Sequence, residues 1–309
     1  MNGSQTFLDQ LNSAARTGTN FGAFAAPDGR AAALNAVNKV DAVMALPDVT
    51  TKILRAVEDP NTTTQQLCAL VSQDPALMTR ILTVVNSSLF GLRGKVDSIE
   101  RAVVHLGLRG VKQLAVAAGL GQVFRGNGIG DCTPKRIWMH SIAVAVAARE
   151  LAREMSIPAA EEIFIAGLVH DLGLLAAIQV FPHHLEVVCH QAKASSVDFC
   201  QLEQSMYGAD HQLLGEALAA RWKFPKICQL VACFHHSPAS AMFAERQYVG
   251  IVHIADAICC KSDYGFNLTA KHQAVDTTCL SDSRADQAMI DRVSQKLPQL
   301  IAAASSLVN

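Results

Sequence analysis

Seven side chains of the types that bind divalent cations occur between residues 140 and 256, each inside or beside an apolar segment. His170 and Asp171 are adjacent within the run EEIFIAGLVHDLGLL at 161–175, whose other residues mostly form cores. The remaining five are His140, His211, His235, His236 and Asp256. A buried, unpaired carboxylate is costly, so Asp171 and Asp256 both need partners. A cation held between imidazole and carboxylate is one solution, and a purely structural pair with a histidine is the other.

The seven residues come from five separate predicted helices, which favours a common centre over separate burial. If they did not meet, each would need its own buried hydrogen-bonding partner. Mixed imidazole and carboxylate sets suit Fe, Mn, Zn or Mg, and a shared aspartate can bridge two ions. The sequence therefore predicts a centre for one or two divalent ions. The other histidines are predicted to be surface residues (183, 184, 190 and 272) or ordinary residues at the edge of the core (105 and 253).

The elements that must position these residues all read as helices. Ala, Leu, Val and Ile dominate the composition, and only 6% of the residues are aromatic. Pro158 followed by Glu161 and Glu162 indicates the start of a helix at 159–178 that would carry His170 and Asp171. The other predicted helices are 31–43, 49–58, 65–72, 76–85, 99–106, 111–124, 134–155, 182–195, 198–207, 211–222, 225–235, 248–262 and 284–305.

Composition breaks suggest four parts. Residues 1–30 are predicted to be a flexible arm, 31–125 an N-terminal helical subdomain, 126–281 the subdomain with the metal site, and 282–309 a C-terminal helix. The segment RGNGIGD at 125–131 separates the two subdomains. Its glycines resemble a phosphate-binding loop, but no strand precedes them and no lysine follows, which favours a linker.

Charge and cysteine content narrow the function classes. The formal net charge is −1, so nucleic acid is not expected as a partner, and the basic residues Lys52, Arg55, Arg80, Arg93 and Lys95 read as a solvated face. The nine cysteines form no CxxC pair and are predicted to be reduced core thiols of a cytoplasmic protein. No signal sequence and no uninterrupted membrane span of about 20 apolar residues is recognised.

The order of the seven residues resembles that of the HD superfamily of metal-dependent phosphohydrolases. The segments SQDPAL at 72–77, NSSLFG at 86–91, GLVHDLG at 167–173 and GADH at 208–211 further resemble the HDOD family, whose members are HD-related output domains of bacterial signalling proteins. This resemblance covers residues 39–265. It implies an all-α, multi-helix HD-like bundle with an N-terminal helical subdomain.

The resemblance also implies roles for individual residues. The family's metal positions match His140, His170, Asp171 and Asp256. His211, with one or both of the histidines at 235 and 236, would complete a second site, and Asp171 would bridge the two. The implied partners are signalling proteins, or a nucleotide or phosphodiester ligand.

Three departures bear on activity. Leu174 stands where phosphohydrolase relatives often have a lysine, and Ser237-Pro238-Ala239 stands where cyclic-di-nucleotide phosphodiesterases have Gly-Tyr-Pro. Arg136 occupies the place of a glutamate that would hold a third metal. The missing groups would stabilise negative charge on phosphate, a task that would fall to Arg136, Lys135 or Arg109. These departures favour a signalling output or interaction protein. The alternative is a metal-dependent phosphohydrolase in which Asp171 orients the attacking water.

Overall fold

The computed structural model describes residues 46–87, 90, 92, 94–271, 273–276, 279 and 285–307, together with residues 31, 35, 37 and 38. Its elements over this part of the chain are helices, apart from a single bridge between Ile129 and Cys132. The prediction of an all-α fold is confirmed. The predicted arm at 1–30, most of the predicted helix at 31–43, Arg93 and His272 lie outside the described residues.

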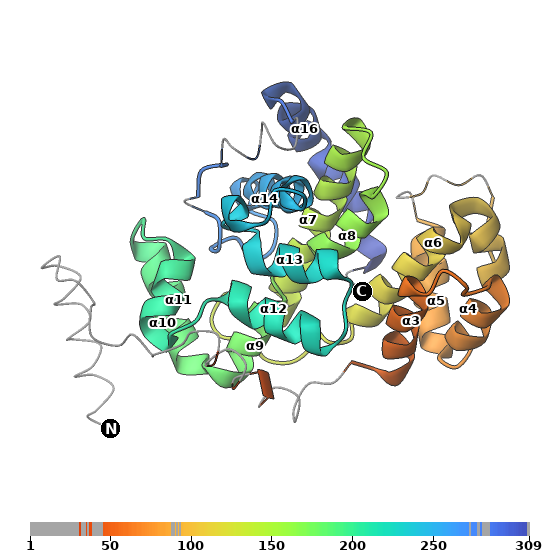
Figure 1. Ribbon diagram of the computed structural model, residues 1–309, viewed down its shortest axis with the longest axis horizontal. Helices are drawn as coiled ribbons and strands as arrows, with labels where there is room; N and C mark the ends of the chain where they lie inside the picture. The colour runs from red at the N-terminus through yellow and green to blue at the C-terminus, as the bar shows by residue number, and fades with distance from the viewer. Residues whose placement is uncertain are drawn as a thin grey trace, which may run out of the picture.

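Four helices form the N-terminal group on the right of Figure 1: α3 (Asp48–Glu58), α4 (Thr64–Val71), α5 (Pro75–Val85) and α6 (Ile99–Leu120). The helices α4, α5 and α6 each have an N-cap side chain. Thr63, Asp74 and Ser98 each accept a hydrogen bond from a backbone N–H of the first turn. The turn after α5 is closed by Asn86, whose side chain bonds both the N–H and the carbonyl of Val96.

The helix predicted to end at Gly107 bends there instead of ending. Gly107 has φ 72° and ψ 161°, which glycine adopts without steric cost, and the helix continues to Leu120. From Val111 to Leu120 every residue of α6 is buried. The glycine thus redirects the chain from the N-terminal group into the interior.

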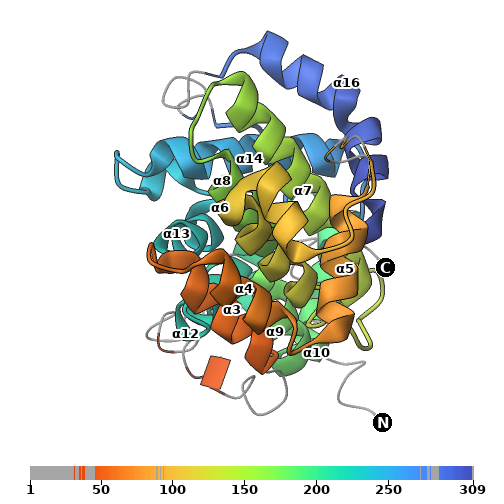
Figure 2. The same ribbon diagram turned by 90° about the vertical axis from the view of Figure 1, so that its right-hand side faces the viewer.

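The remaining helices pack around α7 (Pro134–Glu154), which contacts α8 (Ala160–Val169), α14 (Arg246–Lys261) and α16 (Gln287–Ala303) (Figures 1 and 2). Between α8 and α14 the chain forms α9 (Leu172–Val180), α10 (Pro182–Ala194), α11 (Phe199–Tyr207), α12 (His211–Arg221), α13 (Lys226–Phe234) and the 3-10 turn η1 (Pro238–Ser240). Arg292 and Lys296 of α16 pair with Glu154 of α7. The final turn η2 (Ser305–Leu307) then reaches α5.

The prediction of one continuous helix over 159–178 is wrong at residues 170 and 171, where the helix is interrupted. α8 ends at Val169 and α9 begins at Leu172, so His170 and Asp171 form the junction. Asp171 has φ −94° and ψ 16°, and the Nδ1–H of His170 donates to the carbonyl of Gly167 (2.8 Å). The break turns both side chains toward the same interior point.

The segment Ala160–Val180 has the length and apolar composition of a membrane span, with a mean hydropathy of 1.9, but 89% of its most apolar 18-residue window is buried inside the protein. Such burial is typical of a core helix. Seven of the nine cysteines are also buried, and all nine are free thiols.

Candidate metal centre

The structure brings all seven predicted residues to one place. His140 comes from α7, His170 and Asp171 from the α8–α9 junction, and Asp256 from α14. His211 is the first residue of α12, and His235 and His236 follow α13. Six of the seven are completely buried, and His236 is 9% exposed.

Asp171 lies at the centre, with one oxygen toward each half of the cluster. Its Oδ2 is 3.3 Å from Nε2 of His170 and 3.8 Å from Nε2 of His140. Asp256 completes this first half, with Oδ1 at 2.9 Å from Nε2 of His140. Residues of both halves gather into groups whose ligand atoms lie within 4.8 Å of one another.

The second half consists of three imidazoles around the other oxygen of Asp171. Oδ1 lies 3.5 Å from Nε2 of both His211 and His235. The Nε2 atom of His211 is 3.3 Å from that of His235 and 3.0 Å from that of His236. Both histidines of the 235–236 pair therefore face the cluster, a point on which the sequence left the choice open.

The five histidines are held in the same way, through the nitrogen that faces outward. Each Nδ1 contacts an oxygen that can only accept a hydrogen bond. His140 contacts the carbonyl of Tyr264, His170 that of Gly167, and His235 that of Val231. His211 contacts the carboxylate of Glu203, and His236 contacts the amide oxygen of Gln273. In neutral His170, His235 and His236 the proton is therefore on Nδ1 and the lone pair of Nε2 points into the cluster, whereas Nε2 of His140 also contacts an acceptor, Oδ1 of Asp256 at 2.9 Å. This is the arrangement that orients histidine ligands in metal sites.

Several buried polar atoms at the centre have no hydrogen-bonding partner. They are Nε2 of His170, both oxygens of Asp171 and Oδ2 of Asp256. Buried acceptors without donors are rare in native proteins. The donor set therefore fits a divalent cation.

In the absence of an ion, the protonation of each side chain in the centre depends on its burial and on the charges beside it. Burial lowers the pKa of His211, but the Glu203 carboxylate outweighs it and raises that pKa to about 10. Burial also opposes ionisation of Asp171, yet His170 and the other imidazoles hold its pKa well below the usual range. The pKa values of His235 and His236 are lowered, first by burial. Without an ion, His211 therefore holds a proton that a cation would displace.

Glu203 is the residue that sequence reasoning missed. It is completely buried on α11, and its carboxylate accepts hydrogen bonds from the ring of His211 (2.5 Å), from the backbone N–H of His211 (2.9 Å) and from the hydroxyl of Tyr207. The only sequence signal is an acidic residue eight positions before a candidate ligand. Gln273, which holds His236 at both its ring and its carbonyl, gave no signal.

The remaining histidines that the structure describes do not join the cluster. His253 is buried, but its ring is fully used, because Nδ1 donates to the carbonyl of His235 and Nε2 accepts from the N–H of Asp276. His253 therefore helps to hold the backbone of His235, one of the candidate ligands, through this hydrogen bond. His105 and the three histidines of α10 at 183, 184 and 190 are exposed.

Two glycines allow the backbones that carry the ligands to meet. A Cβ on Gly173 would overlap the carbonyl oxygen of His211 and lie 2.6 Å from the nitrogen of Gly215, so α9 and α12 cross in direct contact. Gly265 has φ +75°, and a Cβ there would lie 2.5 Å from the nitrogen of His140. Side chains at these positions would push His211 and His140 away from Asp171.

One surface cavity has a residue of the cluster in its lining. A surface cavity of about 370 Å³ reaches His236, but its lining residues include Asp198 and Asp210 and no lysine or arginine. The three cations that might replace the missing phosphate-binding lysine lie elsewhere. Arg136 bonds the carbonyl of Gly265 and pairs with Asp131, Arg109 pairs with Glu162, and Lys135 lines a different cavity. Leu174 itself is completely buried.

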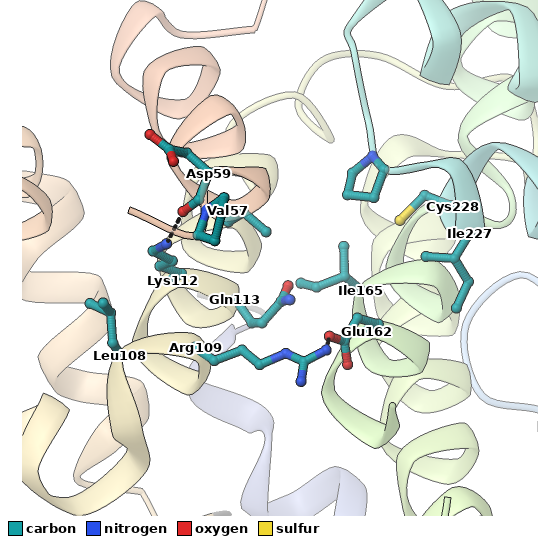
Figure 3. Close-up of a pocket in the computed structure, with 12 residues that line it drawn as sticks. Val57, Asp59, Leu108, Arg109, Lys112, Gln113, Glu162, Ile165, Ile227 and Cys228 are labelled. Atoms are coloured by element: carbon teal, nitrogen blue, oxygen red, sulfur yellow. Dashed lines mark hydrogen bonds and ion pairs between the residues drawn. The ribbon is translucent and has the colours of Figure 1, made fainter. Parts of the chain in front are cut away.

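A cavity of about 480 Å³ lies between the two groups of helices and contains none of the seven residues in its lining (Figure 3). Its apolar residues are Val57, Leu108, Ile165 and Ile227, and the ion pair of Arg109 with Glu162 crosses it. Lys112 points back to the carbonyl of Asp59 (3.2 Å).

Fold and centre together define a helical protein of the HD type. The HDOD domain family model matches residues 43–238, and the chain belongs to this family. The structure resembles an HDOD domain protein of unknown function from Geobacter sulfurreducens, with a TM-score of 0.72, 21% identity, and coverage of 89% of this chain and 97% of that one. It also resembles a "Putative phosphohydrolase" from Shewanella amazonensis, with a TM-score of 0.71, 23% identity, and coverage of 89% and 98%.

A protein of Treponema pallidum described as uncharacterized is 30% identical over 206 residues, which are 66% of this chain. The match covers 40% of that protein, so the chain spans less than half of its curated relative.

Proposed function

We propose that this chain is a bacterial signal-transduction module of the HDOD type, which acts in the cytoplasm by binding signalling proteins. In this proposal its His/Asp centre holds one or two divalent ions that stabilise the fold. The family supports the output role, and the intact ligand set supports the metal.

The observation that carries the choice of a binding role is the closure of the centre. A phosphohydrolase needs an open position at its metal and positive groups that meet the phosphate. Here six of the seven residues are fully buried, and the one described cavity that reaches His236 has acidic but no basic lining residues. The side chain of Leu174 adds no charge.

The residues that would hold the ions divide into two sets. His140, His170, Asp171 and Asp256 would hold one, and His211, His235, His236 and the other oxygen of Asp171 would hold a second. Three imidazoles with a carboxylate favour borderline ions such as Zn, Fe or Mn over Mg. A bound ion of this kind would lower the pKa of a coordinated water toward ~7.

The cavity of Figure 3 is the surface that best suits a protein partner. It presents apolar side chains from two groups of helices together with the ion pair of Arg109 and Glu162. Protein interfaces commonly combine apolar contacts with polar and charged groups.

The test measures metal and partner on the same protein. Leu108→Glu/Ile227→Glu would place charge in the cavity, whereas Val104→Glu changes a residue of α6 that is already 83% exposed. We expect both proteins to retain the metal, measured by elemental analysis. Only the first should lose the proteins that co-purify with the wild-type chain from its own host. Equal co-purification with both variants would argue against the cavity as the interface.

The second candidate function is a metal-dependent phosphohydrolase. One observation favours it: both oxygens of Asp171 lack a hydrogen-bond partner and face two separate ligand sets, as a bridging carboxylate would. Turnover of bis(p-nitrophenyl) phosphate or of nucleotides by the metal-loaded protein, lost in Asp171→Asn, would establish the enzyme. A metal-loaded protein without turnover would leave the binding module.

A further inference from the structure

A second cavity lies where the two groups of helices and the end of the chain meet, and three of its lining residues are positively charged. Arg80 comes from α5, Arg125 from the glycine-containing connection, and Lys135 from the first turn of α7. Its volume is about 380 Å³, and no acidic residue lines it. We call it the cationic pocket.

The positive charge of the cationic pocket is poorly compensated by the protein. Arg125 and Lys135 make no hydrogen bond or ion pair with any described residue, and both are exposed. Arg80 donates to the carbonyl of Ala118 (3.2 Å), and its nearest carboxylate, that of Asp74, is 3.9 Å away. Burial lowers the pKa of Arg80, Asp74 opposes that shift, and the like charge of Arg125 adds to it. Like charges gathered in this way are stabilised by an anion between them.

The backbone adds to the preference for an anion. Lys135 is the second residue of α7, a helix of 21 residues whose amino end carries partial positive charge. Gly126 in the connection has φ +111°, and a Cβ there would meet nothing within 4 Å, so the backbone is open on that side. Arg125 is the first residue of the RGNGIGD segment and Lys135 follows the segment by four residues; neither the metal centre nor the partner surface explains the function of this segment.

The floor of the cationic pocket is apolar. Val84, Phe124, Trp138 and Leu307 are each at most 7% exposed. The indole N–H of Trp138 donates to the carbonyl of Leu307 (2.8 Å), so the ring is fixed and its polar edge is satisfied. A rigid apolar floor below a cationic rim suits a molecule with an anionic end and a less polar body, and the volume lies in the range of about 300–1,000 Å³ typical of small-molecule sites.

We propose that the cationic pocket binds an organic phosphate of nucleotide size, with the phosphate at Arg80, Arg125 and Lys135 and the rest of the molecule over Trp138 and Phe124. The site shares no residue with the His/Asp centre and does not depend on its metal. It also lies apart from the cavity of Figure 3, with which it shares no lining residue.

Isothermal titration of the full chain with ATP, GTP and AMP, beside inorganic pyrophosphate, tests the proposal. Arg125→Gln/Lys135→Gln removes two exposed cations. Arg101→Gln/Lys226→Gln removes the same charge from exposed positions outside the pocket. We expect one nucleotide to bind with a stoichiometry of one. The pocket variant should weaken binding by about 100-fold, or about 10-fold for each charge-assisted hydrogen bond, and the control variant by less than about 2-fold.

Two further comparisons make the result decisive. Asp171→Asn should bind the nucleotide like the wild type, which separates this site from the metal centre. Binding should also weaken between ~50 and ~300 mM salt. The proposal is overturned if no nucleotide binds up to ~1 mM, if both double variants bind alike, or if pyrophosphate or a single-stranded oligonucleotide binds more tightly than every mononucleotide.

Discussion

Replacing Asp171 by asparagine should empty both halves of the centre at once. Asp171 is the only described residue with one carboxylate oxygen beside His170 (3.3 Å) and the other beside His211 and His235 (both 3.5 Å). Asparagine keeps the shape but removes the charge and turns one oxygen into a donor that faces nitrogen. We therefore expect the metal content to fall to near zero. Asp256→Asn, which changes one half only, should lose no more than one equivalent.

The size of the effect on stability follows from mass action. An ion present at 1,000 times its Kd contributes about 4 kcal/mol to the free energy of unfolding. A chain of 309 residues gains roughly 0.65 kcal/mol/K of entropy on unfolding at about 2.1 cal/mol/K for each residue, so each ion should raise Tm by about 6 °C. Two ions would give about 12 °C on the same basis.

Scanning calorimetry with and without EDTA, paired with elemental analysis, measures both quantities. EDTA should lower the Tm of the wild type, whereas the Tm of Asp171→Asn should not change with EDTA. Asp198→Asn is a suitable control, because this residue caps α11 outside the cluster and asparagine also caps helices. The bridging role of Asp171 would be refuted by a variant that keeps the wild-type metal content, or that loses the same single equivalent as Asp256→Asn.

Three further outcomes are expected. Glu203→Gln should weaken metal affinity by about 10–100-fold, because Glu203 fixes the orientation of the His211 ring. Competition with a chelating dye measures this affinity. An unchanged affinity would contradict the orienting role of Glu203. Glu203 raises the pKa of His211 to about 10, so a metal ion must displace a proton from His211. The metal affinity should therefore rise from about pH 6 to pH 9, and titrations in weak buffer should show proton release. A metal affinity that does not change with pH would contradict this expectation. Gly173→Ala should lower the free energy of unfolding by about 3 kcal/mol in urea, because its Cβ would overlap α12, whereas Gly110→Ala should change it by less than about 1 kcal/mol. Equal effects of the two glycine variants would show that α9 can shift at no cost.

The candidate ligands were predictable because each is a polar residue in an apolar context. Asp171 and Asp256 interrupt runs that otherwise bury completely, and that conflict is visible without coordinates. Helix starts at Asp74 and Ser98 were predictable for a local reason, since the cap and the N–H that it accepts are three residues apart. The sequence contains both partners of such an interaction.

The parts that sequence reasoning missed depend on contacts between distant segments. Glu203 stands in a short helix with polar neighbours, and it becomes buried only because α11 folds against the start of α12. The break at His170 and Asp171 follows an apolar run that favours a continuous helix. It exists because the two side chains turn toward His140 and Asp256, which are supplied by other helices. Gln273 and the carbonyl of Tyr264 hold their histidines in the same long-range way.

The separation of the ligands along the chain also determines when the centre can form during synthesis. His140 and Asp256, whose side chains meet at 2.9 Å, are 116 residues apart. A ribosome that has made the chain as far as His236 has supplied Asp171, His211, His235 and His236, the group proposed to hold the second ion, whereas the other half still lacks Asp256. Only when α14 emerges can both carboxylates face the imidazoles. The two halves of the centre would therefore become complete one after the other during synthesis, and the half that contains His140 and Asp256 would be the last.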